Sequence, residues 1–378
     1  MKCKLSDICV FRKGKVDVSK LTLKTYISTE NMLPNKGGVT EASSLPTVQL
    51  TQEYKKGDIL VSNIRPYFKK IWQAKYDGGC SNDVLVFQGN SNIDGDFLYY
   101  ILANDDFFAY SMATSKGTKM PRGDKTSIMQ YEVPIFDIDT QRKIASVLRS
   151  LGEKIELNST INNNLEQQME ALYKSWFIDF EPFNGAKPEN WSKTDIYSIA
   201  DIIYGAPFSS KLFNTDGVGK PIIRIRDLKN QEFVTYTTEE HPKGHLIQPG
   251  DIIVGMDGEF RPYIWGNESA WLNQRVCIFE NKRPKGKAFV FFTIKPLLNV
   301  IEQTQVATTV IHIGKKDYDA FKITLPDKTS LDRFDEITAP MIDQIITNRL
   351  ENKRLAALRD ALLPKLMSGE LDVSNIDL

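Results

Sequence analysis

Apolar residues recur at alternating spacings of four and three in two long stretches of the chain. In the first stretch the repeating positions are Ile144, Leu148, Leu151, Ile155, Asn158, Asn162, Leu165, Met169, Leu172 and Trp176. The second stretch follows the same frame 186 positions later, at Ile337, Met341, Gln344, Asn348, Glu351, Leu355, Leu358, Leu362 and Lys365. This period is typical of the a and d positions of a coiled coil. It predicts two long helices, within residues 140–181 and 329–378.

Both predicted helices are polar at the centre of the repeat and apolar towards the ends. Asn158 and Asn162 interrupt the first seam, and Asn348 stands between two further polar positions in the second. Buried polar residues at such positions fix register and partner, and an antiparallel pair would place the two polar centres against each other. We therefore expect the helices to pair, each about 54 Å long for about 36 residues. The alternative is two unrelated amphipathic helices that each cover their own domain.

The remainder of the chain contains an internal duplication. Gly57-Asp58 before an aliphatic strand at 59–61 recurs as Gly250-Asp251 before a strand at 252–254. Further strands are predicted at 84–87, 222–225 and 276–279, while the apolar runs 97–102 and 289–294 fit either a helix or a strand. We expect an α/β (mixed) fold in which two tandemly duplicated domains, residues 1–139 and 182–328, are separated by two long antiparallel coiled-coil helices with pseudo-twofold symmetry.

Composition is that of a globular chain, with 41% hydrophobic and 25% charged residues. No apolar run reaches the roughly 18–20 residues of a membrane span and no signal peptide is recognised, so a soluble, cytoplasmic protein is expected. The four cysteines are scattered and suggest neither a zinc site nor a disulfide. The 48 basic and 48 acidic residues balance, although residues 12–75 hold 12 basic and 5 acidic side chains, a local field that attracts phosphate.

Signatures of catalysis are missing from the sequence. There is no Walker-type glycine loop and no G-x-G-x-x-G motif, and His241 and His245 are separated by residues that keep them off one helical face. We expect no catalytic residue, no metal ligand and no cofactor in this chain. Two alternatives stay open: a magnesium-dependent nuclease that uses Asp251, Asp257 and Glu259, and a scaffold that joins two protein partners without touching DNA.

Side chains of the kinds that read DNA cluster after the duplicated strands. Residues 62–70 interleave arginine and lysine with aromatic and amide side chains, and residues 256–263 and 272–275 stand at the matching place in the second half. Arg reads guanine, Asn or Gln reads adenine, and Lys contacts phosphate. Two copies that differ in sequence would read different bases; the alternative is that these are polar loops without a partner. The predicted DNA-binding residues are Asn63, Arg65, Tyr67, Lys69, Lys70, Lys119, Arg122, Lys211, Arg224, Arg226, Arg261, Tyr263, Asn273, Gln274 and Arg275.

With these residues the chain resembles the specificity subunits of Type I restriction–modification systems over nearly its whole length. The segments 250–254 (Gly-Asp-Ile-Ile-Val) and 272–276 (Leu-Asn-Gln-Arg-Val) are similar to a common family pattern. So are 141–145 (Gln-Arg-Lys-Ile-Ala), 172–177 (Leu-Tyr-Lys-Ser-Trp-Phe) and the ending at 358–371. The first half departs from the pattern, because no Asn-Gln-Arg triplet follows Asp83.

The resemblance implies a target-recognition domain at 1–139, a central spacer helix at 140–181, a second target-recognition domain at 182–328 and a C-terminal spacer helix at 329–378. Each domain would read one half of a split double-stranded DNA target, with the two elements about one helical turn, near 34 Å, apart. Family members dock two methyltransferase subunits, which carry S-adenosylmethionine, and often two restriction subunits that use ATP and Mg²⁺. The chain itself would be non-catalytic. The outer helix faces near Trp176 and Phe177 are the expected docking surface, although both side chains equally fit packing on the adjacent domain.

Overall fold

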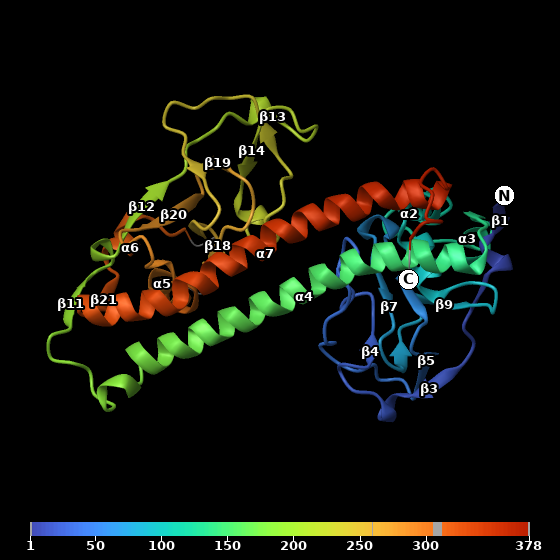
Figure 1. Ribbon diagram of the computed structural model, residues 1–378, viewed down its shortest axis with the longest axis horizontal. Helices are drawn as coiled ribbons and strands as arrows, with labels where there is room; N and C mark the ends of the chain where they lie inside the picture. The colour runs from blue at the N-terminus through green and yellow to red at the C-terminus, as the bar shows by residue number, and fades with distance from the viewer. Residues whose placement is uncertain (1, 259, 305–311, 377–378) are drawn as a thin grey trace. The chain divides into compact units, whose positions relative to one another are not determined.

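The chain folds into two compact units, described by a computed structural model that covers residues 2–258, 260–304 and 312–376 (Figure 1). The first unit consists of Met1–Glu153 with Ala356–Leu378, and the second unit consists of Lys154–Leu355. Two long helices, α4 (Ile138–Phe177) and α7 (Lys328–Ser368), each contribute residues to both units.

Within the second unit, α4 and α7 lie side by side and run in opposite directions (Figure 1). Asn348 Nδ2 donates a hydrogen bond to Asn162 Oδ1 at 2.8 Å, and one turn away Asn158 Nδ2 donates to Glu351 Oε2 at 2.7 Å. Residue numbers rise on one helix as they fall on the other, which defines an antiparallel pair. The prediction that the polar centres face each other is confirmed, and these hydrogen bonds satisfy polar atoms that burial would otherwise leave unpaired.

Within the first unit, the beginning of α4 and the end of α7 share one hydrophobic core. Leu148 of α4 is fully buried in the same cluster as Leu363 and Leu366 of α7. Beyond the end of α7, the Ser374 carbonyl accepts a hydrogen bond from Lys143 Nζ at 2.7 Å. The apolar beginning of α4 and the apolar end of α7 are therefore buried together against the adjacent domain body.

The buried face of α7 is shifted from the predicted frame, whereas that of α4 follows it. The seam positions of α4 are buried or half-buried at Leu148, Leu151, Ile155, Asn158, Asn162 and Leu165. On α7, Asn348 is buried and Met341 and Leu355 are half-buried, but Gln344 and Leu358 are exposed. The neighbouring Ile342 and Ile345 are buried in the core of the second unit instead. The reason is that α7 packs against this core as well as against α4, which turns its buried face by about one residue.

Each unit is built on a four-stranded antiparallel sheet with the same strand order. In the first unit the order is β2 (Cys9–Phe11), β9 (Val84–Gly89), β6 (Ile59–Ser62) and β7 (Ile71–Gln73). In the second unit it is β12 (Ala200–Tyr204), β20 (Val276–Asn281), β17 (Ile252–Gly255) and β18 (Pro262–Ile264). The shared order confirms the predicted duplication.

The same turn leads into β6 and into β17. Gly57 and Gly250 both have a φ of 92°, a left-handed conformation that favours glycine. The carboxylates of Asp58 and Asp251 each accept a hydrogen bond from the backbone N–H three residues earlier, at 2.8 and 2.7 Å. A Gly-Asp pair is therefore required by the backbone geometry and the hydrogen bonding of the turn in both copies.

Two further sheets complete each unit among the described residues. The outer sheet of the first unit has the order β3 (Lys15–Asp17), β5 (Leu50–Tyr54), β8 (Gly78–Cys80) and β4 (Tyr26–Ile27). That of the second unit has the order β13 (Phe213–Asn214), β15 (Tyr236–Thr237), β14 (Lys220–Ile223), β19 (Ala270–Leu272) and β16 (Leu246–Ile247). Antiparallel pairs β1 (Lys2–Lys4) with β10 (Glu132–Pro134), and β11 (Ser192–Asp195) with β21 (Lys322–Leu325), close each domain body just before a long helix.

Shorter helices pack on the central sheets. The first unit contains α1 (Gly95–Ala103), α2 (Asp105–Ala113) and α3 (Lys125–Ile128), and the second contains α5 (Lys287–Thr304) and α6 (Lys315–Asp319). The apolar runs 97–102 and 289–294, which fitted a helix or a strand, are both helical. No described helix combines the length and the apolar character needed to cross a membrane.

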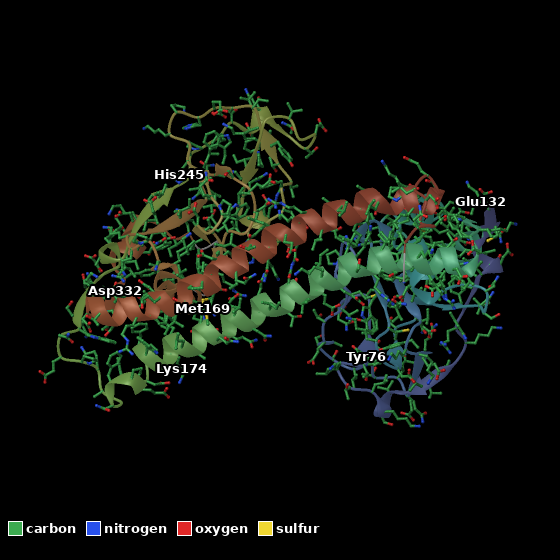
Figure 2. All side chains as sticks on the ribbon, in the orientation of Figure 1. Tyr76, Glu132, Met169, Lys174, His245 and Asp332 are labelled. Carbon is green, nitrogen blue, oxygen red and sulfur yellow. The ribbon has the colours of Figure 1, made fainter. Side chains whose placement is uncertain are left out.

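The aromatic end of α4 is buried in the core of the second unit. The ring of Phe177 lies 4.9 Å from Phe334 and 5.0 Å from Phe289, and Trp176 is buried in the same cluster. Met169, labelled on α4 in Figure 2, is fully buried there too. Of the two interpretations of Trp176 and Phe177, packing on the adjacent domain is therefore the one observed, and these two side chains do not form a docking surface.

Candidate nucleic-acid interface

Backbone hydrogen bonds join two distant loops of the first unit, and both loops carry predicted DNA-binding residues. The Arg65 N–H donates to the Pro121 carbonyl at 2.9 Å, and the Gly123 N–H donates to the Asn63 carbonyl at 3.1 Å. Ile64 and Arg122 form a β-bridge between the same loops. We call this surface, residues 62–70 and 116–124, the first polar edge. It collects the predicted residues Asn63, Arg65, Tyr67, Lys69, Lys70, Lys119 and Arg122.

The first polar edge exposes cations beside an aromatic pair. Tyr67 is 49% exposed, and its ring centroid lies 4.7 Å from that of Phe68. Lys119 and Arg122 are exposed, and Arg122 Nη2 lies 3.2 Å from Asp83 Oδ1. Exposed cations interleaved with aromatic rings suit phosphate contact and base stacking.

Lys69 and Lys70 are already engaged within the unit. Lys69 Nζ forms an ion pair with Asp105 at 2.8 Å, and Lys70 Nζ donates to the Thr29 carbonyl at 2.6 Å. Burial lowers the pKa of Lys70. Both lysines therefore position the loop, and a phosphate contact from either would compete with these bonds.

Asn63 and Arg65 carry the signs of a strained site. Asn63 Oδ1 and Arg65 Nε are buried without a hydrogen-bond partner among the described residues, and Arg65 has a left-handed φ of 50°. An unsatisfied buried polar atom costs about 1–3 kcal/mol, and a non-glycine residue in the left-handed region costs a similar amount, about 1–3 kcal/mol. Such features cluster at functional sites, so they favour a binding role for this loop over a purely structural one.

The second unit brings Arg275 together with two residues that the sequence analysis did not connect to DNA. The Met256 N–H donates to the Arg275 carbonyl at 2.9 Å, and Asp257 forms a β-bridge with His312. His312 Nδ1 lies 2.6 Å from Asp257 Oδ1 and 3.1 Å from Arg275 Nη1. Arg275 Nε lies 3.6 Å from Asp257 Oδ2. We call residues 256–258, 273–275 and 312–314 the second polar edge.

The two polar edges occupy equivalent places in the duplicated fold, with the charges exchanged. Asp83 and Arg275 each directly precede the second strand of the central sheet, β9 or β20. Arg122 and His312 each bridge to the loop that follows β6 or β17. The acid–arginine pair is Asp83 with Arg122 in the first unit and Asp257 with Arg275 in the second. Equivalent positions with different donors and acceptors are suited to reading different bases.

Asn273 links the second polar edge to the outer sheet. The Asn273 N–H donates to the Ile223 carbonyl at 3.3 Å. Arg224 follows Ile223 in the chain, and its guanidinium lies 6.0 Å from the centre of the Phe213 ring. A Cβ at Gly205 would lie 2.0 Å from the Asn273 carbonyl oxygen, so this close approach requires glycine. The predicted residues Asn273 and Arg224 therefore lie near each other.

Three further predicted residues of the second unit are exposed, and of these only Gln274 belongs to the second polar edge. Gln274 adjoins Arg275 in the chain, and Lys211 lies in a 3₁₀ turn of the outer sheet. Arg226 Nη2 donates to Thr235 at 3.2 Å. No hydrogen bond or ion pair joins Lys211 or Arg226 to the second polar edge within the described ranges. Both stay predictions from sequence.

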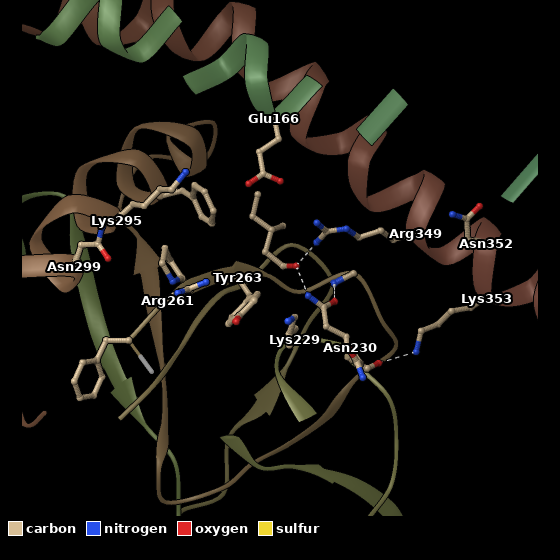
Figure 3. A pocket seen from close by; sticks show the side chains of 16 residues that line it. Glu166, Lys229, Asn230, Arg261, Tyr263, Lys295, Asn299, Arg349, Asn352 and Lys353 are labelled. Atoms are coloured by element: carbon tan, nitrogen blue, oxygen red, sulfur yellow. Dashed lines mark hydrogen bonds between the residues drawn. The ribbon is translucent and has the colours of Figure 1, made fainter. Parts of the chain in front are cut away.

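Arg261 and Tyr263 line a cavity of about 680 Å³ in the second unit (Figure 3). The cavity lies between β18 and residues of α4, α5 and α7. The structure thus separates these two residues from the second polar edge, with which sequence position had grouped them. The hairpin from β17 to β18 explains the difference, because it carries the chain away from Arg275 along the sheet edge.

The structure describes two of the three residues of the nuclease alternative, Asp251 and Asp257. The Asp251 carboxylate accepts the Gln248 N–H at 2.7 Å in its turn, and burial raises its pKa. Glu259 lies outside the described residues. Over residues 2–258, 260–304 and 312–376, no group of three His, Cys, Asp or Glu side chains is placed to hold a metal ion.

Asp83, Asp257 and His312 contact residues of the two polar edges but were not among the predicted DNA-binding residues. Asp257 was named only in the nuclease alternative and within the loop 256–263, and no DNA-binding role was predicted for His312. Alignment of the two copies could have indicated Asp83, because Asp83 and the predicted residue Arg275 directly precede matching strands, β9 and β20. The contact with His312 could not be found in this way, because it depends on a bridge between positions 55 residues apart.

Comparison with known proteins identifies the family. The family described as "Type I restriction modification DNA specificity domain" matches residues 1–167 and 188–359. The chain is 24% identical to the Type I restriction enzyme HindI specificity subunit of Haemophilus influenzae, covering 97% of this chain and 98% of that protein. It is 32% identical over 232 residues to the EcoBI specificity subunit of Escherichia coli, covering 59% of this chain and 46% of that protein.

A solved structure supports the fold. The crystal structure of the Type I restriction–modification system S subunit from M. genitalium matches with a TM-score of 0.59 and 17% identity, covering 97% of this chain and 96% of that one. The duplicated α/β units with two long helices are therefore the architecture of a known class of DNA specificity proteins. The chain belongs to the family of Type I restriction–modification specificity subunits.

Proposed function

We propose that each unit reads one half of a split double-stranded DNA target. The observation that carries the proposal is the pair of polar edges, which stand at equivalent places in a duplicated fold. Arg122 and Arg275 are the exposed arginines of the two edges. Arg reads guanine bidentately, and lysines and tyrosines nearby suit the phosphate backbone.

The differences between the edges predict two unlike half-sites. The first presents Tyr67, Lys119 and Arg122, whereas the second presents Gln274 and Arg275. Gln is suited to adenine in the major groove. Because the two polar edges present different side chains, the protein would recognise a DNA sequence whose two halves differ. Residues 1–139 and 182–328 are the proposed recognition domains, with spacer helices at 140–181 and 329–378.

The proposed partners would carry out the methyl transfer and the DNA cleavage, for which the sequence of this chain contains no recognised motif. Two methyltransferase subunits would carry S-adenosylmethionine, and restriction subunits, where present, would carry ATP and Mg²⁺. Leu157 of α4 is 54% exposed and Ile337 of α7 is 43% exposed, so apolar side chains on both long helices are accessible to such partners. The chain would act as the non-catalytic recognition subunit of a cytoplasmic complex.

Selection of bound sequences from a random DNA pool tests this function. The purified chain, assembled with its methyltransferase, should enrich two short elements separated by a fixed number of unspecified bases. Arg275→Ala should lose the base preference of one element and Arg122→Ala that of the other, while exposed Lys193→Ala should change neither. Enrichment of one continuous element, or of none, would contradict the proposal and favour a scaffold. Cleavage of DNA by the purified chain with Mg²⁺ alone would favour the nuclease alternative.

A further inference from the structure

The cavity of about 680 Å³ in the second unit is strongly cationic (Figure 3). Lys229, Arg261, Lys295, Arg349 and Lys353 line it, whereas Glu166 is the one carboxylate among its described lining residues. Its volume lies in the range of about 300–1,000 Å³ typical of small-molecule sites. The excess of positive charge selects for an anionic occupant.

Two of these cations, Arg349 and Lys353, are half-buried. Arg349 Nη1 donates to the Ile264 carbonyl at 2.5 Å, and Lys353 Nζ donates to the Gln231 carbonyl at 2.9 Å. In the parts of the chain that the structure describes, both side chains donate to backbone carbonyls and neither forms an ion pair with a carboxylate. Burial lowers the pKa of both side chains. Partial burial of a charge costs free energy. Glu166 offsets part of this cost for Arg349, and Glu232 and Glu268 do so for Lys353. An anion in the cavity would offset more of it.

The backbone around the cavity is held in place before any ligand binds. Gln231 Nε2 donates to the Ile264 carbonyl at 2.9 Å, and Gln231 Oε1 accepts the Gly266 N–H at 2.7 Å. A Cβ at Gly266 would lie 2.3 Å from the side chain of Arg349. The loop and the helix are thus closely fitted, and a preformed wall of this kind lowers the ordering cost of binding.

Aromatic and amide side chains complete the lining. Phe260, Tyr263 and Phe291 contribute ring surface, and Asn230 and Asn299 contribute amide groups. Rings suit stacking with a planar heterocycle, and amides donate and accept hydrogen bonds at the edge of a base. Bare phosphate would leave the aromatic part of the wall without a contact.

We propose that this cavity binds a nucleoside phosphate, with the phosphate groups held by Lys229 and Lys295 and the base stacked on Tyr263. Lys229 is exposed and lines the cavity. Lys295 lines it too, and its Nζ pairs with Glu170 at 2.8 Å. The bases of duplex DNA are paired and stacked, so a free nucleotide matches the aromatic wall better than a duplex does. The site goes beyond the proposed reading of DNA and does not depend on it.

Calorimetric titration of the full chain with ADP, pyrophosphate and adenosine tests the proposal. ADP should bind saturably and more tightly than pyrophosphate or adenosine. Lys229→Ala should weaken ADP binding about tenfold, because one charge-assisted contact is lost. Asn299→Trp, at an exposed position of α5, should fill the cavity and abolish binding. Lys187→Ala removes an exposed lysine elsewhere in the unit and should change nothing.

The same variants separate a nucleotide site from a DNA contact. Asn299→Trp should leave the affinity for duplex DNA and the urea midpoint unchanged. Absence of saturable ADP binding to the unmodified chain would overturn the proposal, as would equal binding by Asn299→Trp. Loss of duplex binding in Asn299→Trp, without ADP binding to the unmodified chain, would assign the cavity to DNA and also overturn it.

Discussion

Asn348 of α7 donates a hydrogen bond to Asn162 of α4 at 2.8 Å, and the two residues stand 186 positions apart. The same offset aligns the heptad pattern of the second stretch with that of the first. The two side chains therefore occupy the equivalent position of the two repeats and meet at the centre of the antiparallel pair. Polar residues at such positions fix register and partner at some cost in stability.

Replacing one asparagine of this pair should destabilise the chain more than replacing both. Asn348→Leu leaves Asn162 Oδ1 buried without its donor, which should lower the free energy of unfolding by about 1–3 kcal/mol. The double variant Asn162→Leu/Asn348→Leu removes both polar groups and should recover most of that loss. Urea unfolding of the three proteins measures the difference. Thr347→Ala, at an exposed position of the same turn, is the control. A double variant that is less stable than Asn348→Leu would contradict this account.

Asp257→Asn should strengthen binding to DNA of any sequence while weakening discrimination. Asp257 partly neutralises Arg275 and holds it in place with His312, so removal of its charge leaves the arginine less constrained. Anisotropy titrations against target and unrelated duplexes, between about 50 and 200 mM salt, should show a steeper salt dependence. Glu189→Gln changes the net charge equally at an exposed position and should leave discrimination intact. Weaker binding to every duplex would show that Asp257 only supports the loop.

Arg122→Ala and Arg275→Ala should each affect one half-site. Loss of a bidentate guanine contact should weaken binding by about 1–3 kcal/mol and relax base preference at one position. Competition binding assays with duplexes altered in one half-site at a time measure which half-site each variant fails to recognise. A uniform loss of affinity on all sequences would instead make the affected arginine a phosphate contact.

Three cysteines should resist alkylation until the chain unfolds. Burial raises the pKa of Cys9, Cys80 and Cys277 to about 12, so roughly one thiol in ten thousand is ionised at about pH 8. Because the pKa is raised, labelling should stay slow at every pH at which the chain is folded. Cys3 is half-buried and should react first with iodoacetamide, as mass spectrometry can follow. Equal labelling of all four thiols in the native chain would contradict the burial described here.

The duplication was predictable because short-range signals carry it. Gly57-Asp58 and Gly250-Asp251 are local turn chemistry, and heptad spacing is visible in the sequence itself. The predicted buried face of α7 is about one residue away from the observed one. Ile345 is buried instead of the predicted Gln344, because it packs against the core of the second unit, a contact that the heptad spacing does not encode.

The candidate site was predictable only in part. The loop at 62–70 was found from composition, but its contact with Arg122 depends on a bridge to Ile64 that no local pattern encodes. Likewise, Arg261 and Arg275 are close in sequence yet belong to different surfaces, because the β17–β18 hairpin separates them. Pairings between distant segments decide which side chains share an edge.

The most direct test of the central claim is methylome sequencing of a host that expresses the neighbouring methyltransferase with this chain, without it, or with its Arg275→Ala variant. The account predicts a split motif that is methylated only when the chain is present, and relaxed bases in one half of that motif with the variant. Identical methylation with and without the chain, from an active and assembled methyltransferase, would contradict the claim that this protein supplies the sequence specificity.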